Sequence, residues 1–384
     1  MGGLVLGLIA IAGIVYVLET PRVHEVARET PDARAVLLAS FPKSGSNWAR
    51  FLVGHLQTES QLDFARAEAV VPDLEFGPNR MHFAAAHDAS HFLNNKYRSS
   101  NRVASSFAEM HERRVAASKW PAAWKSHQPW LDPRKHSVVA GPAELAALGY
   151  PRCSGAADAP LVNVEAAQCL CPNCPARWRR VLLVVRDGRS ALCSYFQFQK
   201  QLGKGGDATF ADFLDSPASK YGLSWAAHAR SYLDAPNVSL TLPWLDDAPA
   251  HRPSATARQQ RDHTDIFVLR YEDAHGAPLH TLRKLAQWLL DDDAAALPDT
   301  VDADFLQSVL ERSSFETMRA AEDESGTPLF DALYPTARQK HDFHLVRQGK
   351  VDGWRECVHN EAEADALFEK KDPGFKDTMR RLGY

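Results

Sequence analysis

The chain has 384 residues, and its 44 Lys and Arg against 48 Asp and Glu give a formal net charge of −4 at pH 7. This balance excludes a broadly basic protein that would bind nucleic acid or an acidic polymer over its whole surface. The length suits one large α/β domain with insertions, and no repeat of fixed period indicates a solenoid.

Residues 1–18 are uniformly apolar and carry no charged side chain. Such a run is at the lower limit for a helix that crosses a bilayer. No basic stretch precedes it, and no small-residue cleavage pattern follows Leu18. We therefore expect residues 1–20 to be an uncleaved, single-pass signal anchor, residues 21–34 a stem, and residues 35–384 one folded domain in the Golgi lumen.

Residues 35–57 predict a strand, an anion-binding loop and a helix. The apolar run 35–39 is typical of a strand buried in a parallel sheet. Residues 41–46, called the anion loop below, contain Pro, Lys, Gly and two Ser, and they precede a helix that Ser46 or Asn47 can cap. Backbone N–H groups and the helix dipole make this an anion site. Lys43 precedes Gly45 and no Lys-Ser/Thr pair follows, so a magnesium-triphosphate site is disfavoured.

Two further segments repeat this strand, polar turn and helix order. A buried strand at 181–185 leads to Arg186 and a helix that contains Ser194. Arg186 and the Ser194 hydroxyl are suited to hold a second phosphate by charge-assisted hydrogen bonds. A third strand at 265–271 precedes a helix with a leucine stripe typical of a core-facing surface.

These segments resemble the sulfotransferases that use 3′-phosphoadenosine 5′-phosphosulfate (PAPS). FPKSGSNW at 41–48 is similar to Tyr-Pro-Lys-Ser-Gly-Thr-Thr-Trp, the family's 5′-phosphosulfate loop. KSHQP at 125–129 resembles Lys-Thr-His-Leu-Pro. Arg186 and Ser194 keep the eight-residue interval of the family's 3′-phosphate motif.

Three later segments extend the resemblance. LRYED at 269–273 looks like the family's Tyr-Glu-Asp signature, and SSFETM at 313–318 resembles Thr-Ser-Phe-x-x-Met; both border adenine. VRQGK at 346–350 with Gly353 and Trp354 resembles the segment that closes over the 3′-phosphate. It departs from the family in two ways. Gln348 stands where the family has a Lys, a loss of charge for which Lys350 is expected to compensate, and the order of Gly and Asp is reversed in Asp352 and Gly353.

The resemblance implies a P-loop-like three-layer α/β domain with a central parallel sheet and helices on both faces. It implies transfer of a sulfuryl group from PAPS to an acceptor hydroxyl, without a metal. His127 is the implied general base, because a hydroxyl becomes a good nucleophile when a base of near-neutral pKa takes its proton. Lys43 and Lys125 would offset developing charge. The implied PAPS-binding residues are Lys43, Ser44, Gly45, Ser46, Asn47, Trp48, Arg186, Ser194, Tyr271, Ser313, Phe315, Arg347, Gln348 and Gly349.

The cysteines predict disulfides in a lumenal domain. The segment 136–176 reads as an insertion and holds Cys153, Cys169, Cys171 and Cys174, for which disulfides are favoured and zinc is the alternative. We expect Cys193 and Cys357 to be buried small hydrophobes. A sequon at Asn237 predicts glycosylation.

Two other functions remain open from the sequence. A P-loop nucleotide kinase would require magnesium and prefer ATP, and a non-catalytic lumenal binding protein would bind nucleotide without turnover. The sequence does not resolve the acceptor, which we expect to be a carbohydrate, a lipid or a small molecule with a free hydroxyl. The family's dimerisation pattern is not recognisable at 354–361, so no dimer is inferred.

Overall fold

The computed structural model describes residues 35–58, 60–73, 120–121, 123–127, 178–204, 206–220, 223–235, 237–245, 263–290, 301–327 and 343–384. The predicted anchor, stem and 136–176 insertion with its four cysteines lie outside these residues. Among the described helices, none has the length and apolar character needed to cross a membrane.

A five-stranded sheet forms the centre of the domain, in the order β2-β1-β3-β5-β4. Every pairing between neighbouring strands is parallel, which confirms the predicted fold class. The strands are β1 (Val36–Ser40), β2 (Ala123–Ser126), β3 (Arg180–Val185), β4 (Val238–Thr241) and β5 (Thr264–Arg270).

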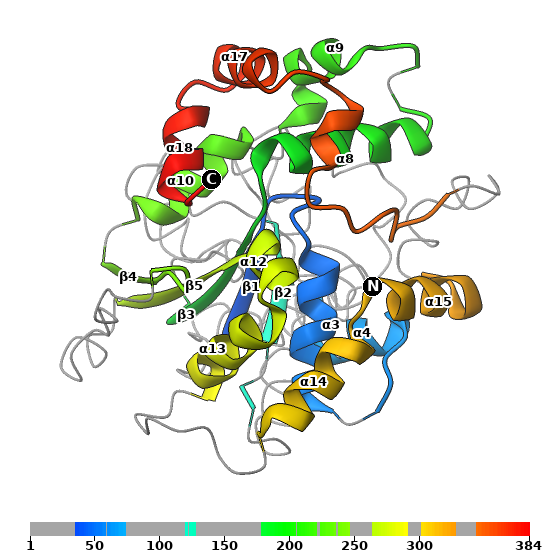
Figure 1. The fold of residues 1–384 in the computed structure, drawn as a ribbon, viewed down its shortest axis with the longest axis vertical. Coiled ribbons are helices and arrows are strands. Elements are labelled where there is room, and N and C mark those ends of the chain that lie inside the picture. The colour runs from blue at the N-terminus through cyan, green and yellow to red at the C-terminus, as the bar shows by residue number, and fades with distance from the viewer. Residues whose placement is uncertain are drawn as a thin grey trace, which may run out of the picture.

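Helices cover both faces of this sheet (Figure 1). One face carries α8 (Gly188–Gln201), α9 (Phe210–Asp215), α10 (Trp225–Leu233), α17 (Glu361–Lys371) and α18 (Phe375–Arg381). The other carries α3 (Ser46–Gln57), α13 (Pro278–Leu290) and α14 (Ala303–Arg312). The remaining described helices are α4 (Phe64–Val70), η3 (Pro217–Ser219), α12 (Tyr271–Gly276), α15 (Phe315–Ser325) and η4 (Gly353–Glu356).

Successive side chains of each strand enter different cores, because they point to opposite faces of a sheet. Leu37 and Ala39 pack in the core of the first face, and Val36 and Leu38 pack in that of the second. A strand buried on both sides needs a continuous apolar run, which is the pattern that the sequence shows at β1, β3 and β5.

Cys193 and Cys357 form a disulfide, so the expectation that both are buried free thiols is wrong. Cys193 lies in α8 and Cys357 follows η4, with 5.9 Å between their Cα atoms and 164 residues between them in the chain. The bond therefore links the end of η4 to α8, two elements that pack against each other.

Reduction of this disulfide is expected to lower the free energy of unfolding by about 2–4 kcal/mol, because a cross-link restricts the unfolded chain. Thermal unfolding with and without reductant measures the change. The double variant Cys193→Ser/Cys357→Ser is the control and should melt at the temperature of the reduced chain. An unchanged melting temperature in that variant would contradict the expectation.

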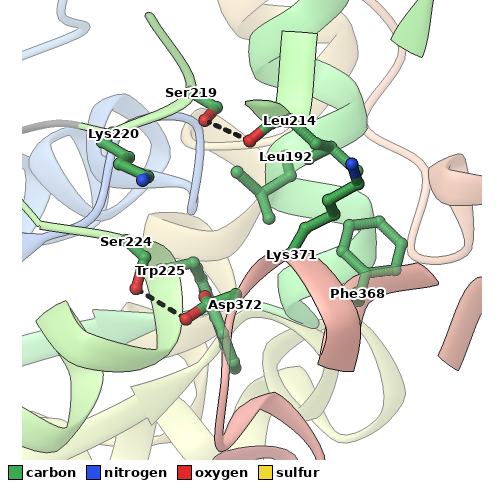
Figure 2. A pocket seen from close by; sticks show the side chains of 9 residues that line it. All are labelled: Leu192, Leu214, Ser219, Lys220, Ser224, Trp225, Phe368, Lys371 and Asp372. Atoms are coloured by element: carbon green, nitrogen blue, oxygen red, sulfur yellow. Dashed lines mark hydrogen bonds between the residues drawn. The ribbon is translucent and has the colours of Figure 1, made fainter. Parts of the chain in front are cut away.

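A small pocket lies among α8, α9, α10 and α17, and none of the predicted site residues lines it (Figure 2). Its polar groups serve the fold. The Asp372 carboxylate accepts hydrogen bonds from the Ser224 hydroxyl at 2.6 Å and the Ala226 N–H at 2.8 Å, at the start of α10. Asp372 therefore links the end of α17 to the start of α10 at the edge of this pocket.

Candidate active site

The predicted site residues gather where the parallel strands end. Phe41, His127, Arg186 and Tyr271 directly follow β1, β2, β3 and β5. Ala39 pairs with Ser126, and Val185 pairs with Arg270, so these strands end side by side. The carboxyl edge of a parallel sheet is the usual ligand site of such folds.

The anion loop turns sharply between β1 and α3. Lys43 and Gly45 have φ angles of 66° and 100°, in the left-handed region that favours glycine. A Cβ on Gly45 would lie 2.7 Å from Tyr271 Cδ2, so this position requires glycine for space as well. Gly45 is also the N-cap of α3 and supplies no side-chain hydrogen bond, so the predicted cap at Ser46 or Asn47 is wrong. The helix start therefore remains suited to an anion.

Lys43 lies among other cations. Its ammonium is 3.5 Å from the Leu345 carbonyl oxygen and 4.7 Å from the centre of the Phe198 ring. Burial, followed by the charges of Arg186 and Arg347, lowers the pKa of Lys43 to about 8. An anion bound beside Lys43 would relieve this repulsion.

The affinity for the nucleotide that the resemblance implies is therefore expected to weaken as the pH rises above about 8, because Lys43 then loses its positive charge. The expected slope is at most about tenfold per pH unit, the limit for one linked proton. Titration of 3′-phosphoadenosine 5′-phosphate (PAP) between pH 7 and pH 10 measures it. Lys43→Arg stays charged throughout and should remove the slope. An equal slope in that variant would assign the titration to another group.

Arg186 joins the anion loop to a C-terminal segment, residues 343–357, which we call the strap. Its guanidinium donates to the Lys43 carbonyl at 3.3 Å and to the Lys350 carbonyl at 2.5 Å. It also lies 4.8 Å from the centre of the Tyr271 ring. Within the described residues, Arg186 Nε and the Ser44 hydroxyl are buried without a hydrogen-bond partner. Buried donors of this kind usually have a partner, so both suit a bound anion.

The strap brings further cations to this edge. Arg347 and Lys350 both pair with Glu356, at 2.7 and 3.6 Å. Gln348 is exposed. Gly349 has a φ of 67°, and a Cβ there would lie 2.7 Å from Phe315 Cδ2, so the strap packs its backbone against that ring.

Aromatic rings form a second part of the site. Trp48 and Tyr271 meet edge to face with centroids 5.9 Å apart, and His275 lies 4.5 Å from Tyr271. His275 was missed in the sequence, although its place one turn after Tyr271 on α12 was a usable signal. These rings suit a stacked base.

Two serines, Ser194 and Ser313, were predicted to contact the 3′-phosphate and the adenine. Ser194 is half-buried in α8. The Ser313 side chain is fully buried, and its hydroxyl is 3.0 Å from His55 Nδ1. Contact of either hydroxyl with a nucleotide stays a prediction.

His127 is held by both ring nitrogens. Nδ1 is 2.8 Å from the Ser40 carbonyl oxygen and 3.1 Å from the Ser40 hydroxyl, and Nε2 is 3.0 Å from Lys125 Nζ. A carbonyl only accepts, so we assign the proton to Nδ1 and leave Nε2 as the acceptor. Burial and the Lys125 charge lower the pKa of His127 to about 3. His127 is therefore a neutral imidazole at neutral pH.

The described residues hold no group of three or more His, Cys, Asp or Glu arranged to bind a metal ion. Ser40 and the buried Asp73 were not predicted as site residues, although the Asp73 carboxylate lies 2.5 Å from Lys125 Nζ. Asp73 and Lys125 are 52 residues apart, so no local pattern joins them.

The family description "Sulfotransferase domain" matches residues 170–383, more than half of the chain. A retinol dehydratase solved with retinol and PAP is 17% identical, with a TM-score of 0.47, covering 96% of this chain and 87% of its own. A mouse sulfotransferase solved with PAP is 14% identical, with a TM-score of 0.44, covering 94% and 93%. No match was found among curated proteins.

The fold and the family match together define a transferase of the α/β class. The chain belongs to the sulfotransferase family, whose members are PAPS-dependent transferases.

Proposed function

We propose that this protein transfers a sulfuryl group from PAPS to an acceptor hydroxyl, with His127 as the general base. The observation that carries the proposal is the neutral His127, whose Nε2 is an acceptor beside the Lys125 ammonium. Ser40, which binds the other ring nitrogen, directly precedes the anion loop.

The residues present fit PAPS. Ser44 and Arg186 offer buried donors without partners in the described chain. Arg186 and Arg347 lie close enough to Lys43 for their charges to add to burial in lowering its pKa. The anion loop and the start of α3 would hold the 5′-phosphosulfate, and Arg186 with the strap would hold the 3′-phosphate. Trp48 and Tyr271 would contact the adenine, with Phe315 at its border.

PAPS supplies the sulfuryl group: the acceptor oxygen gains the bond to sulfur as the bond from sulfur to the 5′-phosphate oxygen breaks, and PAP leaves. His127 Nε2 takes the acceptor's proton. Lys125 now donates to that same nitrogen, so its ammonium must release Nε2 and is then available to an anionic oxygen. Lys43 stabilises negative charge from the anion loop.

The acceptor is proposed to be a hydroxyl of a carbohydrate, a lipid or a small molecule. We further propose that residues 1–18 anchor the chain in the membrane with its catalytic domain in the Golgi lumen. The apolar N-terminus supports this proposal, as does the exposed Asn237 side chain of the sequon, just before β4.

Calorimetric titration of the full chain with PAP, AMP and ATP, with and without magnesium, tests the cofactor class. We expect PAP to bind more tightly than AMP and without metal. The reason is that only PAP carries a 3′-phosphate, which Arg186 and the cations of the strap would bind. Preference for magnesium-ATP would overturn the proposal in favour of a nucleotide kinase. Tight PAP binding without PAPS turnover would instead indicate a binding protein.

A further inference from the structure

A chain of buried charges lies behind His127. Asp73 Oδ2 is 2.5 Å from Lys125 Nζ and 3.2 Å from Arg50 Nη2. Arg50 in turn pairs with Glu68 at 2.8 Å. Asp73, Arg50 and Lys125 are all buried. Removing one member of a buried ion pair leaves the other charge uncompensated, so these residues depend on one another.

The backbone fixes Asp73 beside β2. The Lys125 N–H donates to the Pro72 carbonyl at 2.8 Å, and Asp73 pairs with Lys125 as an isolated parallel bridge. The Asp73 N–H donates to Glu68 Oε1 at 3.0 Å. The carboxylate therefore meets Lys125 from a backbone position set by the sheet.

The Asp73 carboxylate stays ionised there. Burial alone would raise the pKa of Asp73, but Lys125 and then Arg50 outweigh it and hold this pKa at about 2. A permanent carboxylate thus faces an ammonium that also contacts the proposed base.

We propose that Asp73, fixed by Arg50, is a positioning residue of the sulfuryl-transfer site, which holds the Lys125 ammonium against His127 Nε2. This inference rests on the proposed function of His127 and Lys125. Asp73 acts through Lys125: one N–H of the ammonium stays on the carboxylate, while the N–H on Nε2 is the one to be released. The ammonium therefore remains within reach of both His127 and the transferring group.

A double-mutant cycle tests this coupling in the full chain. The variants are Asp73→Asn, Lys125→Met and the two combined, with turnover measured from radiolabelled PAPS on 2-naphthol, an alkyl glucoside and a sterol. Each single change should lower kcat by roughly 10- to 100-fold, as expected for loss of a positioned charged group. The combined variant should be within about twofold of Lys125→Met, because residues that act as a unit are not additive. Costs that multiply would overturn the proposal.

Glu68→Gln is the matched control. It removes a carboxylate from the same Arg50 but leaves the contact of Asp73 with Lys125 in place, and its amide oxygen can still accept the Asp73 N–H. It should keep kcat within about threefold, because the Asp73–Lys125 contact remains and the changed side chain touches neither Lys125 nor His127. A loss as large as that of Asp73→Asn would overturn the proposal, because the effect would then not depend on the Asp73–Lys125 contact. If Asp73→Asn alone does not fold, the double variant Asp73→Asn/Lys125→Met still tests the proposal, because it loses one charge of each sign. Its kcat should be within about twofold of that of Lys125→Met.

A second readout needs neither PAPS nor acceptor. In nitrogen NMR of the ¹⁵N-histidine-labelled chain, the His127 Nε2 signal reports the hydrogen bond from Lys125. We expect this signal to shift in Asp73→Asn towards its position in Lys125→Met, and to stay unchanged in Glu68→Gln. An unshifted signal in Asp73→Asn would overturn the inference. Absence of PAPS turnover in the unsubstituted chain would overturn the proposed function, while this spectrum still decides the role of Asp73.

Discussion

Replacement of His127 with alanine is expected to leave PAP affinity within about twofold while turnover falls by roughly two to four orders of magnitude. The affinity is preserved because the proposed phosphate contacts come from the anion loop, Arg186 and the strap. The turnover falls because no other group is expected to take the proton of the acceptor hydroxyl. Calorimetry with PAP and initial rates with PAPS measure the two quantities separately.

His263→Ala is the control for this substitution. His263 directly precedes β5, at the strand end opposite to Tyr271, and its Nε2 contacts the Ser239 hydroxyl at 3.2 Å. Its loss should leave turnover unchanged. Near-normal turnover in His127→Ala would remove His127 from the catalytic role, and a large loss of PAP affinity would make it a binding residue.

Replacement of Arg186 with methionine is expected to weaken PAP binding by roughly 100-fold, and AMP binding by much less. Arg186 is buried and has one nitrogen without a partner in the described chain, so a 3′-phosphate would receive charge-assisted hydrogen bonds from it. Truncating a buried charged partner costs about 2–5 kcal/mol. The ratio of the PAP and AMP dissociation constants isolates the 3′-phosphate contribution.

Arg189→Met is the matched control for Arg186. The Arg189 guanidinium pairs with Asp187 at 2.7 Å and with Asp365 at 3.0 Å, and it lies over the Trp354 ring. It therefore joins α8 to α17 and η4, and its loss should reduce stability without changing the PAP-to-AMP ratio. If Arg186→Met lowered the affinities for PAP and AMP by the same factor, Arg186 would only support the anion loop and the strap.

The strands at the centre of the sheet could be predicted because burial on both faces demands uninterrupted apolar residues. β1, β3 and β5 have this pattern. β4 is a half-buried edge strand, Val-Ser-Leu-Thr, and it was not predicted because an edge strand need not be apolar throughout. The start of α3 was placed correctly, but its N-cap was not. Gly45 occupies the cap because the left-handed backbone and the nearby Tyr271 ring leave no room for a side chain.

Three contiguous parts of the candidate site could be predicted from the sequence alone: the anion loop around Lys43, the Lys125 and His127 pair, and Arg186 after its strand. Local order is enough there, because a parallel sheet brings every such turn to one edge. The contacts between distant segments are seen only in the folded chain. The Cys193–Cys357 disulfide joins residues 164 apart, and the Asp73–Lys125 ion pair joins residues 52 apart. Such pairs arise from packing, which no spacing along the chain encodes.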